Sequence, residues 1–170
     1  MDYFAIIRQF GRTLRNLDAI LEKAVRHAEG RKFEVNNFVG SRLFPDMLTF
    51  AAQVRIACDT AKAAAANLSG TPAPRHEDTE TTVAELRGRI TKCLDYLDRL
   101  TAADFQRTSP DTRVVLPNRP GKYLLADEYL LGRQVPNFYF HVVTAYALLR
   151  QGGVEIGKTD FLGPLQFIDQ

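Results

Sequence analysis

The strongest constraint on the fold is one long apolar stripe in the first part of the chain. Between Asp2 and Glu29, large apolar side chains recur every three or four residues, which is the repeat of one face of an α-helix. The stripe consists of Phe4, Ile7, Phe10, Leu14, Leu17, Leu21 and Val25. It predicts a long helix, with Gly30 as its C-cap. Gly11 inside the pattern either permits a close helix approach or is simply tolerated.

Two further helices are predicted in the middle of the chain. The first covers residues 45–68, because Pro45 suits a first helical turn, and it follows a loop at 31–44. Its inward face would carry Met47, Phe50 or Ala51, Val54, Cys58, Ala61 and Ala65. After a Pro-containing connection at 69–80, a capping box formed by Thr82 and Glu85 opens the next helix, at 82–100. Its inward face would carry Val83, Leu86, Ile90, Cys93 or Leu94, and Leu97.

The last third of the chain combines a hairpin, a helix and an arm. Two short β-favouring runs, 113–116 and 122–125, flank a segment that contains two prolines and a glycine, so they predict a small hairpin. A short helical stretch at 128–134 precedes a fourth long helix at 136–151. Residues 154–170 are expected to form an irregular arm packed on the bundle or on another subunit. The sequence thus predicts one domain, 1–170, of the all-α class: an antiparallel four-helix bundle with a small hairpin before the last long helix.

Composition and charge exclude several classes of function. The 22 basic and 20 acidic residues are mixed along the chain and give a net charge of +2, so a nucleic-acid-binding surface is not expected. No run approaches the roughly 18 apolar residues of a membrane span. The N-terminus lacks the pattern of a secretory signal, and Cys58 and Cys93 lie in helical apolar patterns typical of buried reduced thiols. We therefore expect a soluble cytoplasmic protein.

Several charged residues are expected to form solvated ion pairs at helical spacing. Arg55, Asp59 and Lys62 share one face of the second helix. On the third helix, Glu85 would pair with Arg89, and Asp95 with Arg99, each four residues apart. Exposed pairs of this kind contribute little to stability or function.

One histidine is the main candidate for chemistry. His141 falls on the same arc of the fourth helix as Phe138, Val142, Ala145 and Leu149, so it points into the bundle. An inward imidazole is either a core side chain that is bonded to a neighbour or a metal ligand. Other polar residues within reach of the bundle interior are Gln53, Asp46 and Tyr146. The chain has no P-loop, dinucleotide fingerprint, Glu-x-x-His motif or nucleophile triad.

Two segments resemble a known bacterial family of unknown function. They are Asn137-Phe138-Tyr139-Phe140-His141 and Gly157-Lys158-Thr159-Asp160-Phe161-Leu162-Gly163. They resemble domain-of-unknown-function family 1993, which is similar to the DinB/YfiT-like metalloenzyme bundles. The resemblance implies a nickel, zinc or iron site made of three histidines. His141 matches one of them, but the other two positions fall on Ala145 and near Gln53.

These observations leave two functions open. In the first, His141, Gln53 and Tyr146 form a buried polar network or a small-ligand pocket in a bundle that has lost its metal site. In the second, a divergent metal-dependent enzyme of thiol transfer or hydrolysis uses His141, with Asp46 as a further ligand. We favour the first, without a bound metal. The apolar arm and outward Tyr139 and Phe140 also suggest a homodimer.

Overall fold

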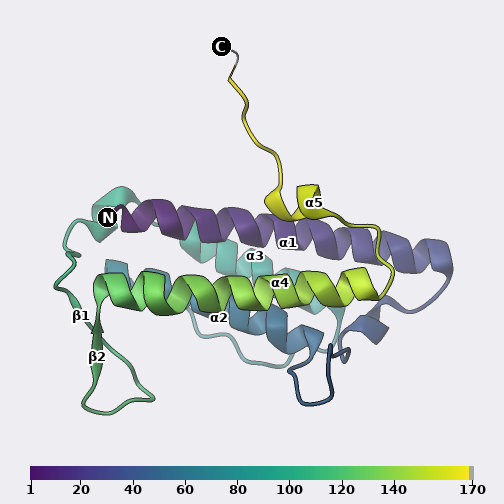
Figure 1. The fold of residues 1–170 in the computed structure, drawn as a ribbon, viewed down its shortest axis with the longest axis horizontal. Coiled ribbons are helices and arrows are strands. Elements are labelled where there is room, and N and C mark those ends of the chain that lie inside the picture. Colours follow the sequence, from purple (N-terminus) through teal and green to yellow (C-terminus); the bar gives the residue numbers. More distant parts are fainter. Residues whose placement is uncertain (169–170) are drawn as a thin grey trace.

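The chain folds into a bundle of four long helices (Figure 1). The structure is a computed structural model that describes residues 1–168. The four helices are α1 (Tyr3–Arg31), α2 (Phe50–Ser69), α3 (Val83–Leu97) and α4 (Val135–Gln151). Their apolar faces meet in one core, where Phe10 of α1 stacks on Phe138 of α4 with the ring centroids 4.3 Å apart. The predicted all-α bundle is confirmed.

The helices do not alternate strictly up and down. α2 runs antiparallel to α4, since Thr60 contacts Asn137 and Gln53 contacts His141. α2 and α3 instead run in the same direction, since Asp59 contacts Arg89 and the Thr71 carbonyl beyond α2 accepts from Tyr96. The connection between them must therefore cross back along the bundle, which explains why it is too long for a tight turn.

Shorter elements join the long helices. They are η1 (Val35–Phe38), η2 (Ala102–Phe105), β1 (Arg113–Val115), β2 (Tyr123–Leu125), the π-helix η3 (Glu128–Gln134) and α5 (Lys158–Leu162). β1 and β2 form the predicted hairpin, in which Val114 pairs with Leu124. η3 continues directly into α4, so the predicted helical stretch before Pro136 is present in π form.

The ends of α1 show which groups stop a helix. The Asp2 side chain caps the first turn by accepting from the Ala5 N–H at 2.9 Å. The prediction that Gly30 ends the helix is wrong, because α1 continues to Arg31 and Lys32 adopts the left-handed conformation, with φ of 57°. The Lys32 and Phe33 N–H groups then bond to carbonyls of the last turn, which closes the helix without a glycine.

α2 begins five residues later than the sequence predicts, at Phe50 instead of Pro45. Thr49 is the N-cap, and its hydroxyl accepts from the Ala52 N–H. The Phe50 and Ala51 N–H groups donate to the carbonyls of Ser41 and Val39 in the preceding loop. These carbonyls satisfy the first helical N–H groups, so the helix needs no additional turn before Phe50. Pro45 therefore lies in an exposed turn.

The segment after α4 is more regular than the predicted arm. α5 packs on α1, where Asn16 donates to the Phe161 carbonyl and Lys23 pairs with Asp160 at 2.6 Å. Beyond α5 the chain turns away from the bundle (Figure 1). The side chains of Leu165, Phe167 and Ile168 are exposed there instead of packed. The last two residues of the predicted arm, 169–170, lie outside the described residues.

Gly11 provides a test of how tightly α1 packs. A Cβ at this position would lie 3.5 Å from Arg15 Nη1 and 3.9 Å from Leu94 Cδ2, which is ordinary contact. Gly11→Ala should therefore raise the free energy of unfolding by about 0.5–1 kcal/mol, because alanine restricts the unfolded chain and favours a helix interior. Urea denaturation followed by circular dichroism measures the difference.

Gly152 is the matched control, because its φ of −72° suits any residue. A Cβ there would lie 2.3 Å from Cε1 of the buried Phe38 ring. Gly152→Ala should therefore lower the free energy of unfolding by about 1–3 kcal/mol, because the added methyl group overpacks the core. A loss of stability in Gly11→Ala would mean that the α1–α3 contact does require a glycine.

Candidate functional site

His141 and Gln53 form a buried polar pair between α4 and α2. The His141 Nδ1 atom lies 2.7 Å from Gln53 Oε1, and the two residues are 7% and 1% exposed. The Gln53 amide nitrogen donates to the Leu48 carbonyl, so its oxygen faces the imidazole and accepts from Nδ1–H. This arrangement sets the tautomer of the ring. Within residues 1–168, Nε2 makes no hydrogen bond, so it is the ring atom left for water or a ligand.

The surroundings of His141 keep the imidazole neutral. Burial removes the ring from water and lowers the pKa of His141 from its ordinary value of 6.5. The Phe140 ring meets the imidazole edge-on, with the centroids 5.2 Å apart. Phe140 is exposed, as the sequence predicts. The prediction that Tyr139 points outward is wrong, because its half-buried ring packs against Phe10 and Phe138.

The other two predicted site residues lie elsewhere. Tyr146 is half-buried and packs edge-on against Phe161 of α5, at a centroid distance of 6.0 Å. It lies five residues beyond His141, which places it on a different side of α4. Asp46 is exposed in the turn before α2, not in the first helical turn where the sequence places it, and has no hydrogen bond to His141 or Gln53 among residues 1–168.

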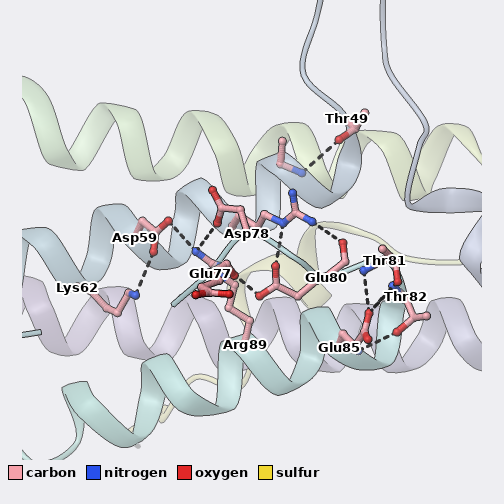
Figure 2. Close-up of polar contacts among 12 residues, drawn as sticks. Thr49, Asp59, Lys62, Glu77, Asp78, Glu80, Thr81, Thr82, Glu85 and Arg89 are labelled. Carbon is pink, nitrogen blue, oxygen red and sulfur yellow. Dashed lines mark hydrogen bonds and ion pairs between the residues drawn. The ribbon is translucent and has the colours of Figure 1, made fainter. Parts of the chain in front are cut away.

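A second polar cluster surrounds Arg89 of α3, and the sequence did not reveal it (Figure 2). The expected surface pair with Glu85 is wrong, because Arg89 is only 2% exposed. Its Nη2 atom lies 2.7 Å from Asp59 and 3.0 Å from Asp78, and its Nη1 atom lies 2.9 Å from Glu80. Glu85 instead completes the predicted capping box with Thr82. Its carboxylate accepts from the Thr82 N–H, and the Thr82 hydroxyl accepts from the Glu85 N–H.

The cluster also includes the three residues predicted as a solvated group on α2. Arg55 pairs with Glu80 at 2.9 Å, and Lys62 pairs with Asp59 at 3.0 Å. Lys62 is 5% exposed and also donates to the Pro74 carbonyl, so the prediction of full solvation is wrong. Burial alone would raise the pKa of Glu80, but its hydrogen bonds with Arg89 and Arg55 outweigh burial and keep that pKa below the usual range.

Two other sequence predictions concern the same helices. Asp95 and Arg99 are both exposed, but no ion pair joins them in the part of the chain that the structure describes. Cys58 and Cys93 are buried free thiols, as expected, and the Cys93 thiol donates to the Cys58 carbonyl at 3.5 Å. The hydrogen bond with Cys93 and burial raise the pKa of Cys58, which suits a packing role and not a nucleophile.

Comparison with known proteins identifies the family. The family described as Domain of unknown function (DUF1993) matches residues 3–162. The chain belongs to the DUF1993 family. It is also 43% identical to a DinB family member protein from Shewanella denitrificans, whose crystal structure superposes with a TM-score of 0.92. The match covers 96% of this chain and 93% of that one. A search of curated proteins finds no match.

The His141 region of this DUF1993 chain does not fit the three-histidine site that the resemblance implies. Gln53 presents an amide oxygen and Ala145 a buried methyl group, so Nε2 of His141 is the one imidazole donor left of the three that the resemblance implies. Nickel, zinc and iron sites usually need three or more imidazole, thiolate or carboxylate donors. Among the described residues, no group of three or more His, Cys, Asp or Glu side chains is placed to hold a metal ion.

Removing the guanidinium group of Arg89 should strongly destabilise this DUF1993 chain. Arg89→Met should lower the free energy of unfolding by about 3 kcal/mol, because Glu80 would remain partly buried without its strongest partner. Urea denaturation measures the change. Arg99→Met, at an exposed position just beyond the end of α3, is the matched control and should change stability by less than about 0.5 kcal/mol. Equal effects of the two substitutions would contradict a structural role for the cluster.

The lowered pKa of His141 predicts a specific pH dependence of stability. Above pH 6.5 the imidazole is neutral in both the folded and the unfolded chain, so its full contribution is present. As the pH falls below 6.5, the unfolded chain binds a proton that the folded chain resists, and stability is lost. His141→Gln should therefore lose less stability than the wild type between neutral pH and pH 5, measured by urea denaturation.

His76 contributes in the same direction and needs its own variant. Burial and the nearby Lys62 ammonium lower the pKa of His76. His76→Gln should flatten the pH profile independently, and the two effects should add because the residues share no contact. An unchanged profile in His141→Gln would show that His141 is not held neutral by the fold.

Proposed function

We propose that this chain is a DinB-like binding bundle that does not carry out metal-dependent catalysis. The observation that carries the proposal is that the side chain facing His141 from α2 is the amide of Gln53, near the position where the resemblance implies a second histidine. Their hydrogen bond occupies Nδ1 of His141 and leaves only Nε2 open to a ligand, and one imidazole nitrogen is too few donors for a nickel, zinc or iron site. The pair satisfies two buried polar groups, which is what a packed core requires.

The composition of the pair supports this proposal. An amide oxygen is a weak ligand for nickel, zinc or iron, whereas it is a good acceptor for an imidazole N–H. Truncating one member would leave the other buried and unpaired, at a cost of about 1–3 kcal/mol. The alternative, a divergent enzyme of thiol transfer or hydrolysis, would have to use Nε2 of His141 together with water or with residues such as Asp46.

Elemental analysis of the untagged protein, purified without chelator, distinguishes the two functions. We expect well under one zinc, nickel or iron per chain, with no difference between the wild type and His141→Ala. His27→Ala is the matched control for a helical histidine outside the pair. Near-stoichiometric metal that disappears only in His141→Ala would overturn the proposal and favour the divergent enzyme.

A double-mutant cycle tests the structural role of the pair independently of metal. His141→Leu and Gln53→Leu should each destabilise the protein, whereas the double variant should lose about 0.5–3 kcal/mol less than the sum. Strictly additive effects would mean that the two side chains do not stabilise each other.

The remaining expectations from the sequence stay predictions. Within residues 1–168, no helix has both the length and the apolar composition that crossing a membrane requires. The cytoplasmic location and the homodimer are untested by the structure.

A further inference from the structure

A groove lies between the first half of α1 and the end of α3, on the side of the bundle away from His141. The cavity has a volume of about 820 Å³, within the usual range of small-molecule sites. His141 and Gln53 join α4 to α2, whereas the groove is lined by α1 and the residues that end and follow α3. The two places are therefore separate sites.

One wall of the groove is strongly basic. Arg8, Arg12 and Arg15 lie on one side of α1 at helical spacing and all line the cavity. Arg15 is neutralised, because it bonds both carboxylate oxygens of Asp98 at 2.6 Å. Within residues 1–168, neither Arg8 nor Arg12 pairs with a carboxylate. Arg8 stands over the Phe4 ring at 5.9 Å, and Arg12 donates to the Pro164 carbonyl.

Two guanidinium groups one helical turn apart repel each other unless an anion lies between them. An arginine fork also binds carboxylate, sulfonate and phosphate groups with two parallel hydrogen bonds. The wall formed by Arg8 and Arg12 thus has the chemistry to accept an anionic head group.

The base of the same groove is apolar. Phe4, Ile7, Leu97 and Leu100 line it, and Gly11 lies among them without a side chain to fill the space. Ile7, Leu97 and Leu100 are already buried, so an apolar body would gain most of its contact from the half-buried Phe4 ring, which also carries the Arg8 guanidinium. Burial of such a body contributes about 0.8 kcal/mol for each CH₂ group.

We propose that the α1–α3 groove binds a small amphipathic organic anion, with its head on Arg8 and Arg12 and its apolar body over Phe4, Ile7, Leu97 and Leu100. This inference rests on the proposed function, because it gives the binding bundle a ligand class and a site. Binding in the groove does not require the His141 side chain, which does not line it.

Isothermal titration calorimetry with dodecanoate tests the inference on the full chain. We expect saturable binding of one dodecanoate per chain that weakens as salt is added. Arg8→Gln and Arg12→Gln should each weaken binding by about ten-fold, since each removes a charge-assisted hydrogen bond. Arg99→Gln, just beyond the end of α3 and outside the groove lining, should bind as the wild type does. Both groove arginines are at least partly exposed, so these variants are expected to fold, which circular dichroism checks.

Three further ligands and one variant separate the possible outcomes. Dodecanol should bind at least about ten-fold more weakly than dodecanoate, and dodecyltrimethylammonium should not compete. Equal affinity for dodecanol, or unchanged affinity in both arginine variants, would overturn the site. Binding to phosphatidylglycerol vesicles without binding to monomeric dodecanoate would overturn it in favour of a membrane surface. Loss of dodecanoate binding in His141→Ala would place the ligand at the His141–Gln53 pair, which overturns the groove and leaves the proposed binding role intact.

Discussion

The guanidinium of Arg89 lies where α2, α3 and the connection between them meet, and its contacts determine how these segments fit together. A charge with so little exposure is stable only when carboxylates and carbonyls surround it. Asp59 supplies a carboxylate from α2. The connection supplies the carboxylates of Asp78 and Glu80 and the backbone carbonyl of Glu77. The connection is thereby held across both helices. That anchorage allows α2 and α3 to run in the same direction although the chain between them must return along the bundle.

The helices were predictable because their signal is local, whereas the polar clusters were not. The apolar stripe of α1 and the capping box of α3 repeat or close within four residues, so the sequence alone locates them. The partners of Arg89 come from up to 30 residues away, and the nearer carboxylate of Glu85 was the more obvious choice. The start of α2 was missed for a similar reason, since carbonyls of a loop replace the first helical turn.

Two of the four candidate site residues could be placed correctly from the sequence. Helical periodicity places His141 inside the bundle, and the family resemblance points to Gln53 as its partner on α2. The structure brings these two together at 2.7 Å. Tyr146 and Asp46 were proposed because they are near in sequence to the right elements, but rotation around α4 and the late start of α2 place them elsewhere. A DinB family member that is 43% identical to this chain has the same fold in its crystal structure.

The position of α4 has a consequence for synthesis of the chain. The Tyr3 hydroxyl donates to Asp127, 124 residues away, and Phe10 stacks on Phe138, so the first and the fourth long helix complete the same core. Contacts of such long range form late, because a large loop must close before they contribute. During translation α1 leaves the ribosome long before α4 does, whereas α2 and α3, which also pack on α1, follow sooner. The part of the α1 apolar stripe that faces α4 therefore stays uncovered until α4 has been made.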